Sequence, residues 1–347
     1  MKKSNLIAVD LAKNTLQVCL LNEDDQVISN KSIRVGGFAK FLAKQQTSTV
    51  AFEACSSSHY WARVAQQLRH TAKILPAKIV EQFRQGQKTD ANDALAIGIT
   101  ARQPNIHSVG IKTVEQQNVQ SLLRIQQHLS DQLTATSNML RGLMIEFGIR
   151  FPKGVKALKV QVPLALEDAS NELSFAARAG LNLAWQQWLS SRHYLDQIER
   201  EILQLTASID ACKRLTALEG IGPKNALALY AEIGDGKHFS NGRGASACIG
   251  LTPEQHSTGG KTKIGHIRKG VSANTRLRST LITGSIAVLN ALERRPAKNQ
   301  KEQWLKDLAA RRGKGRAAVA LANKNIRTAW SMLAHSTCYQ PAQLIAL

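Results

Sequence analysis

Residues 113–141 contain neither glycine nor proline, and this uninterrupted stretch constrains the fold more than any other feature of the chain. Its leucines recur at heptad-type spacing. A second apolar stripe, with residues alternately three and four positions apart, runs from Leu195 to Ile209. The two stripes predict long helices of coiled-coil type, over 113–147 and 183–211, that pair with each other or with a second protomer.

The segment between these helices, residues 150–170, contains Pro152, Gly154 and Pro163, and this composition predicts a turn region. A chain of 347 residues is long enough for two domains joined by an elongated element. The expected parts are an N-terminal domain over 1–108, a coiled-coil linker over 109–211 and a C-terminal domain over 212–347.

The N-terminal part alternates short apolar runs with helical patterns. The expected strands are 4–10, 15–21, 26–33, 48–52 and 72–75, and the expected helices are 38–46, 57–70 and others up to about residue 103. The polar residues Asn22 to Asp25 form a turn in this scheme, so the first three strands make an antiparallel meander. Strands first, then alternating helix and strand, predict an α/β domain with a mixed sheet, which is the order of an RNase H-like fold.

Acidic residues stand at the ends of two of these strands and on one later helix. Asp10 ends the first strand and Glu53 follows the fourth, while Asp90 and Asp93 are spaced to share one helix face. A strand-ending aspartate is often a turn former, and an aspartate pair three apart is often a solvated face. Their joint placement where an RNase H-like sheet carries acids favours a single site. Thr89 is also placed to cap the helix.

Converging carboxylates repel one another unless a cation offsets their charge. Oxygen ligands without histidine or cysteine suit Mg²⁺, or Mn²⁺ in its place. Two such ions can clamp the attacking and leaving oxygens of a phosphodiester displacement. The acids therefore predict a divalent-metal site for phosphoryl transfer.

The chain carries 46 Lys and Arg against 25 Asp and Glu, a formal charge of +21. From Ala211 to the end there are 22 basic and 7 acidic residues, so the excess is weighted to the C-terminal part. Phosphate backbone is the expected partner. An anionic membrane is the alternative, but no apolar run reaches the roughly 18 residues of a transmembrane helix, and no signal peptide opens the chain. The five cysteines form no CxxC pair, which predicts reduced thiols in a cytoplasmic protein.

The C-terminal part is expected to be mainly α, with short helices and two glycine-rich basic segments. Residues 218–229 contain Gly220, Gly222 and Lys224 and resemble a helix–hairpin–helix element, whose turn brings backbone N–H groups to a phosphate. Glycines that only allow close packing are an equally good explanation.

The second segment, residues 250–270, places Ser257 and Thr258 before Gly259 and Gly260. Cations follow at Lys261, Lys263, Arg268 and Lys269. A hydroxyl on a flexible loop among cations can attack phosphorus, although chemistry alone favours a loop that only grips phosphate. Further phosphate contacts are expected from Arg276, Arg278, Arg294, Arg295 and the basic run Arg311-Arg312-Gly313-Lys314-Gly315-Arg316.

Taken in order, five motifs of this chain resemble those of the DEDD transposases of insertion sequences. This is the Piv/MooV-type or insertion-sequence one-ten family, and the resemblance is strongest to its eleven-eleven subgroup. The motifs are Asp10-Leu11-Ala12-Lys13, Phe52-Glu53-Ala54-Cys55, Lys88-Thr89-Asp90-Ala91-Asn92-Asp93-Ala94, Gly220-Ile221-Gly222-Pro223, and Gly250-Leu251-Thr252-Pro253 with His256-Ser257-Thr258-Gly259-Gly260-Lys261.

The resemblance implies a RuvC-like N-terminal domain, a coiled-coil linker and a C-terminal transposase domain. It implies a bacterial recombinase that acts as a dimer or tetramer on donor and target double-stranded DNA, guided by a structured non-coding RNA, the bridge RNA. It also implies that Asp10, Glu53, Asp90 and Asp93 bind Mg²⁺ and that Ser257 forms a covalent link to DNA. Thr258 is the alternative nucleophile, because an ungapped alignment with other branches places it at that position.

Two other functions fit the same residues. A structure-selective nuclease of the Holliday-junction-resolvase kind would use the same acids with water as nucleophile. A non-catalytic nucleic-acid-binding protein would keep the acids without using them. A covalent protein–DNA adduct would distinguish the recombinase from both the nuclease and the binding protein.

Overall fold

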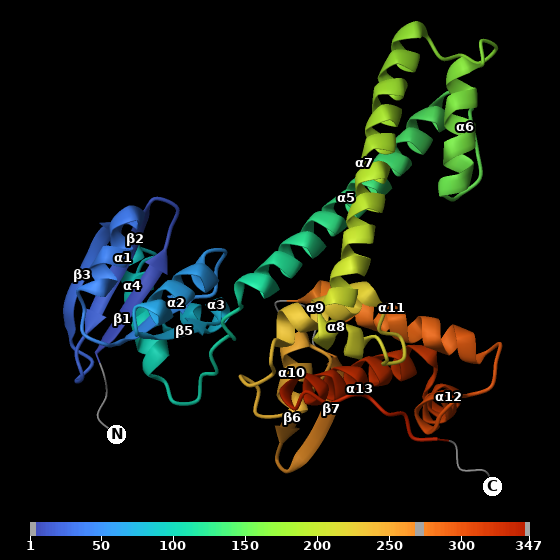
Figure 1. The fold of residues 1–347 in the computed structure, drawn as a ribbon. Coiled ribbons are helices and arrows are strands. Elements are labelled where there is room, and N and C mark those ends of the chain that lie inside the picture. The colour runs from blue at the N-terminus through green and yellow to red at the C-terminus, as the bar shows by residue number, and fades with distance from the viewer. Residues whose placement is uncertain (1–4, 268–273, 344–347) are drawn as a thin grey trace. The chain divides into compact units, whose positions relative to one another are not determined.

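The computed structural model describes residues 5–267 and 274–343 (Figure 1). Its contacts divide the chain into two compact units, Met1–Glu115 and Gln116–Leu347, which we call the N-terminal and C-terminal units. The α/β character of the first and the mainly helical character of the second agree with the sequence prediction. Across the described residues, no helix combines the length and the apolarity that crossing a bilayer requires.

The N-terminal unit is built on a five-stranded mixed sheet in the order β3-β2-β1-β4-β5. The strands are β1 (Leu6–Leu11), β2 (Thr15–Leu21), β3 (Val27–Arg34), β4 (Thr49–Glu53) and β5 (Thr71–Leu75). The first three form the expected antiparallel meander, whereas β4 runs parallel to β1 and β5 parallel to β4. The turn between β2 and β3 is closed by a hydrogen bond from Asn22 N to Gln26 O.

Helices cover both faces of this sheet. They are α1 (Val35–Ala43), α2 (Ser58–Gln67), α3 (Ala77–Phe83) and α4 (Asp90–Arg102). Phe38 of α1 and Trp61 of α2 pack with Val9 on one face. Ile97 of α4 packs with Ala8 on the other. Odd and even positions of β1 therefore serve different cores, as the strand repeat of two requires.

Three helices begin the C-terminal unit, namely α5 (Val114–Glu146), α6 (Val155–Glu167) and α7 (Phe175–Ser208). The prediction that residues 150–170 form a turn region was wrong, because α6 occupies most of that segment and holds Pro163 inside it. A proline removes one backbone hydrogen bond. Burial of Leu158 and Val162 against α5 and α7 stabilises the helix in spite of that loss.

The apolar stripes of α5 and α7 pack within the chain. Leu133 and Leu140 share a core with Trp188 and Leu195, and the indole N–H of Trp188 donates to Ser137 Oγ across 2.8 Å. The sequence left open whether the two apolar stripes pair with each other or with a second protomer. In this core they pack against each other.

The rest of the C-terminal unit is a helical domain with one small hairpin. Its elements are α8 (Asp210–Leu215), α9 (Pro223–Ile233), α10 (Gly242–Ile249), β6 (Pro253–Thr258), β7 (Lys261–Ile267), α11 (Thr275–Leu292), α12 (Gln300–Arg312) and α13 (Lys314–Ala334). The expectation of short helices was wrong for α11 and α13, which have 18 and 21 residues. Both are long because Leu281 of α11 and Ile326 of α13 pack with Leu229 of α9 in one core.

Candidate acidic site and serine hairpin

Asp10 and Glu53 lie next to each other at the carboxyl ends of two parallel strands. The register pairs Val9 with Phe52, so the following residues, Asp10 and Glu53, are neighbours across the sheet. Ala8 of β1 belongs to the core on the α4 side of the sheet. Asp10 is two positions further along and therefore shares that face. Glu53 shares this face too, because it lies two positions after Ala51, which belongs to the same core.

The first turn of α4 brings Asp90 and Asp93 to this edge. Thr89 caps the helix, with its side chain accepting from Asn92 N across 3.3 Å, as the sequence predicted. Asn30 of β3 donates to Ala91 O across 2.9 Å and fixes the helix start against the sheet. These bonds set the position of both aspartates.

Gly98 lets α4 approach the sheet closely. A Cβ added there would stand 2.8 Å from a Leu21 methyl carbon and 3.3 Å from the Ala8 Cβ. Real Cβ contacts are almost never as short as 2.8 Å, so a larger residue would have to displace the buried Leu21 side chain or push the helix outward. The closeness of α4 to β1 thus depends on this glycine.

The four acids share one electrostatic environment. Burial raises the pKa of Asp10, and the negative charges of Asp93 and then Asp90 raise it further. Burial also raises the pKa of Glu53, followed by the charges of Asp10 and Asp93. Asp10 and Glu53 therefore lie close enough to other carboxylates for their ionised forms to be disfavoured, as expected when like charges gather at a partly buried site.

Two charged residues at this edge, Glu81 and Arg84, were missed by sequence reasoning, and a third, Lys88, was part of a motif but was given no role. The Arg84 guanidinium forms a salt bridge with Asp93 Oδ1 across 3.3 Å. Lys88 lowers the pKa of Asp10 and of Glu53, whereas Glu81 raises that of Glu53. The only signal available was their position in the residues just before Asp90.

The donor set of this edge fits a hard cation, because every acid offers oxygen and their repulsion would be relieved by positive charge. As they stand, no three His, Cys, Asp or Glu side chains within residues 5–267 and 274–343 are gathered tightly enough to hold a metal ion. Holding one ion with three or more of these carboxylates would require them to rotate toward one another, whereas Mg²⁺ is often held by one or two carboxylates and water.

The segment around Ser257 is a β-hairpin and not the loop that its glycines suggested. Gly259 and Gly260 form its two-residue turn, with φ of 56° and 77°. Positive φ at both positions is the type I′ pattern, which matches the twist of the flanking strands. Paired glycines between two runs of β-compatible residues were the signal that could have predicted this hairpin.

The hairpin places Ser257 and Thr258 on opposite faces, because side chains alternate along a strand. Ser257 is paired with Thr262, while Thr258 is paired with Lys261. Lys263 is paired with the residue before Ser257, so both lysines share the face of Thr258. Arg268 and Lys269 lie outside the described residues.

The helix–hairpin–helix-like segment owes one of its glycines to packing. Gly220 has φ of 79°, and a Cβ there would stand 2.7 Å from the Gly284 carbonyl oxygen of α11. Gly222 precedes Pro223 as the N-cap residue of α9, with no atom crowding its Cβ position. Gly220 thus has a structural role, and Gly222 lies at a helix N-terminus.

Lys224 and Arg276 line one cavity of about 350 Å³ together with Arg124 of α5, which sequence reasoning missed. Burial lowers the pKa of Lys224, and the charge of Arg276 lowers it further. Arg276 also forms a salt bridge with Asp131 across 3.2 Å. The cavity therefore gathers three cations from α5, α9 and α11.

The remaining predicted arginines lie elsewhere on this unit. Arg278 donates to Gly250 O across 3.5 Å, close to the start of the hairpin. Arg311 and Arg312 are exposed in the last turn of α12.

Both halves of the chain match family models. Residues 7–148, which include all four acids, match a DEDD transposase model, and residues 212–301, which include Ser257, match the model described as transposase IS116/IS110/IS902 family.

Relatives of similar length match over nearly the whole chain. A probable family 20 transposase of Pseudomonas aeruginosa is 36% identical over 96% of this chain and 98% of its own. The transposase for insertion sequence element IS1111A of Coxiella burnetii is 33% identical, covering 98% of this chain and 92% of its own. The transposase for IS1328 of Yersinia enterocolitica is 30% identical, covering 98% and 99%. The chain therefore belongs to the IS110 family of insertion-sequence transposases, enzymes of DNA strand transfer.

Proposed function

We propose that this transposase is an RNA-guided, site-specific recombinase that breaks and rejoins DNA through a covalent link to Ser257, with Mg²⁺ held by Asp10, Glu53, Asp90 and Asp93. The observation that carries the proposal is the placement of all four acids at one edge of the N-terminal sheet, where Asp10 and Glu53 are neighbours on parallel strands. Such an edge suits a hard cation and a phosphodiester.

In the proposed reaction, Ser257 Oγ forms a bond to the scissile phosphorus while the bond to the leaving DNA oxygen breaks. The serine proton is lost to solvent or a nearby base, and the leaving oxygen takes up a proton. A hydroxyl of the incoming strand then displaces the serine in the reverse sense. A bound divalent ion supplies positive charge that stabilises the oxyanions of the phosphate.

Ser257 is the preferred nucleophile over Thr258 because its hydroxyl is less hindered and because the motif of the subgroup places serine there. The hairpin supports a positional role, since its type I′ turn fixes which face each hydroxyl occupies. Lys261, Lys263, Arg268, Lys269, Arg276, Arg278, Arg311 and Arg312 are proposed as phosphate contacts of the DNA-binding surface. Lys261 and Lys263 share the face of Thr258 and not that of Ser257, so they would contact phosphates other than the scissile one.

The same proposal includes the finer points of fold and assembly. A RuvC-like fold for the N-terminal unit is supported by its strand order and its mixed parallel and antiparallel pairing. A coiled-coil linker that joins chains into dimers or tetramers is supported by apolar side chains exposed on α6 and α7, such as Leu164, Phe175 and Leu183. A structured guide RNA beside DNA is supported by the basic excess of the C-terminal part. The cytoplasm, at the nucleoid, is the proposed location.

A trapping assay tests the chemistry. The protein is incubated with Mg²⁺, DNA and the RNA that copurifies with it, then denatured and separated by electrophoresis. We expect a protein–DNA adduct that is lost in Ser257→Ala and in Asp10→Ala and is retained in Thr258→Ala. Loss in Thr258→Ala with retention in Ser257→Ala would transfer the role to Thr258.

The same assay decides between this proposal and the other two functions. Cleavage without any adduct would favour a resolvase-type nuclease that activates water. Absence of cleavage in the wild type, with unchanged DNA binding in Asp10→Ala, would favour a binding protein.

A further inference from the structure

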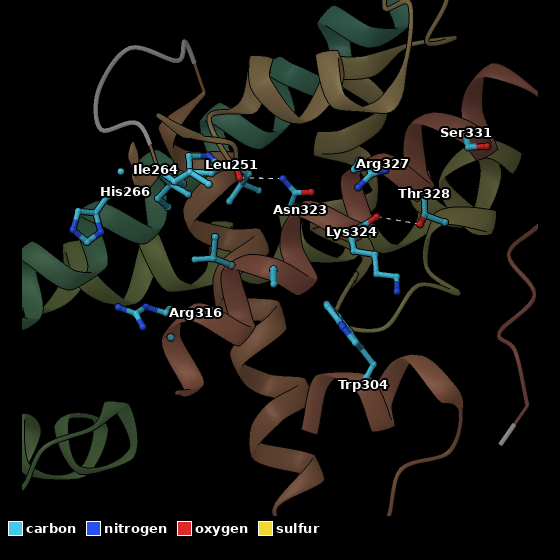
Figure 2. Close-up of a pocket in the computed structure, with 16 residues that line it drawn as sticks. Leu251, Ile264, His266, Trp304, Arg316, Asn323, Lys324, Arg327, Thr328 and Ser331 are labelled. Carbon is cyan, nitrogen blue, oxygen red and sulfur yellow. Dashed lines mark hydrogen bonds between the residues drawn. The ribbon is translucent and has the colours of Figure 1, made fainter. Parts of the chain in front are cut away.

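A cavity of about 1050 Å³ lies between the serine hairpin and helix α13, with α12 at one side (Figure 2). Its floor is apolar, formed by the buried Leu251 and the half-buried Ile267 and Val319. Trp304 of α12 adds an aromatic wall (Figure 2). Concave, mainly apolar sites of about this size bind small organic ligands.

The rim of this cavity is basic. Arg316, Lys324 and Arg327 are exposed along one side of α13, and none of the described lining residues is acidic. Lys324 Nζ stands 4.4 Å from the centroid of the Trp304 ring, and the two side chains lie together in Figure 2. A cation-rich rim above an apolar and aromatic floor is the arrangement that binds a single-stranded nucleic acid, with phosphates outside and a base inside.

The cavity adjoins the face of the hairpin that carries Ser257. Ile264 lines the cavity and is paired with Gln255. Ser257 lies two residues after Gln255 on β6, so it shares the face of Gln255 and Ile264. It is roughly 7 Å from Gln255 along the strand. Ile264 is 74% exposed, so its apolar side chain is open to a ligand in the cavity.

Together these features place an apolar cavity with a basic rim beside Ser257. We propose that the cavity holds one unpaired nucleotide of the DNA strand whose phosphodiester meets Ser257, with its base against Trp304 and Ile264 and its phosphates on Arg316 and Arg327. This inference rests on the proposed function, because it takes Ser257 as the position of the scissile phosphate. Unstacking a base costs free energy, and stacking on an aromatic ring offsets that cost.

DNA with one unpaired base tests the inference without any chemistry. Full-length protein in EDTA is titrated against fluorescein-labelled duplexes that are fully paired, carry a single-nucleotide bulge, or carry an abasic bulge, and fluorescence anisotropy gives each Kd. We expect the bulged duplex to bind about five- to a hundredfold more tightly than the paired one. The gain should vanish with the abasic bulge and in Trp304→Ala, and Trp304→Phe should keep most of it.

Matched variants separate the cavity from general effects. Trp304 also packs against the core of α11 to α13, so Arg316→Ala, on the exposed rim, tests the site without touching that core. It should weaken binding of the bulged duplex more than that of the paired one. Gln303→Ala on the same helix, an exposed position that does not line the cavity, should leave the gain unchanged.

Three results would overturn the inference: equal Kd for paired and bulged duplexes, a gain that survives Trp304→Ala, or tighter binding of the same bulge in RNA. Failure of the serine chemistry would be seen separately. If no adduct forms in the trapping assay while the Trp304-dependent gain is measured, the nucleotide site is supported and the covalent mechanism is not.

Discussion

At the scale of single residues, the acids of the N-terminal unit are held in mutual repulsion. Burial and neighbouring carboxylates both raise the pKa of Asp10 and of Glu53, which means that ionising them in the folded state costs free energy. A bound cation would reverse that cost. Asp10 and Glu53 are therefore expected to lower the free energy of unfolding when no metal is bound, and a bound divalent cation is expected to raise it.

Asp10→Asn tests this expectation. Removing one of the repelling charges should raise the free energy of unfolding of the N-terminal unit in EDTA. The wild type should be stabilised by Mg²⁺ and the variant much less, because binding to the folded state adds stability in proportion to affinity. Thermal unfolding followed by circular dichroism, with and without Mg²⁺, measures both effects. Equal Mg²⁺ stabilisation of the two proteins would remove Asp10 from the metal site.

Two glycines in helices make a matched pair for a packing prediction. Gly98 faces Leu21 and Ala8 at distances that leave no room for a side chain, whereas Gly142 of α5 is exposed, with no atom within 4 Å of its Cβ position. We expect Gly98→Val to lower the free energy of unfolding by about 1–3 kcal/mol through overpacking. Gly142→Ala should raise it by up to about 1 kcal/mol through helix propensity. Urea titrations measure the free energy of unfolding of both variants. An unchanged value for Gly98→Val would mean that α4 packs less tightly against the sheet than in this structure.

At the scale of elements, the start of α12 is fixed by a buried carboxylate. Glu302 accepts two hydrogen bonds of 2.7 Å from Arg295 and one of 2.8 Å from Lys298 N. Asn299 caps the same turn by accepting from Glu302 N across 2.9 Å. The Arg295 hydrogen bonds, acting against burial, hold the pKa of Glu302 below its ordinary value.

This pKa fixes the sign of a pH effect. Because the folded pKa lies below the unfolded one, the folded state binds fewer protons. The stability from Glu302 is therefore complete above its ordinary pKa and is lost as pH falls through the lowered value. We expect Glu302→Gln to lower the free energy of unfolding at neutral pH by about 1–3 kcal/mol. The stability of the Glu302→Gln variant should also fall less steeply than that of the wild type as the pH falls below the ordinary pKa of a glutamate.

A control for this prediction is Glu293→Gln. Glu293 forms an ion pair of 2.9 Å with Lys314, but its side chain is 64% exposed, so its loss should cost less than about 1 kcal/mol. Equal effects of the two substitutions would contradict the role given to burial at Glu302.

At the scale of the whole molecule, the charge of +21 should dominate affinity for nucleic acid. If Arg311 and Arg312 contact phosphates, their joint replacement by alanine should weaken binding to unrelated duplexes alike. It should also reduce the slope of log Kd against log salt by about 2. Anisotropy titrations over a range of salt concentrations measure this, with the exposed Lys44 of the N-terminal unit replaced by alanine as the control. An unchanged slope would remove α12 from the DNA-binding surface.

What the sequence determined by itself is largely local or repetitive. Short apolar runs predicted the strands of the N-terminal sheet, and the position of Asp10 and Glu53 at strand ends followed from them. Thr89 was recognisable as a cap because capping depends on a few neighbouring residues. The motifs shared with transposases indicated the family and the expected chemistry, which the fold alone does not reveal.

What only the tertiary structure decided depends on contacts between distant segments. Helix α6 tolerates Pro163 because α5 and α7 bury its apolar side, and no local rule weighs that burial against a lost hydrogen bond. Gly98 and Gly220 each take their role from a segment far along the chain. The separation of Ser257 from Lys261 and Lys263 followed from strand pairing. The cavity beside that hairpin exists because α12 and α13 pack where the sequence could not place them, as packing is a property of surfaces that meet and not of neighbours in the chain.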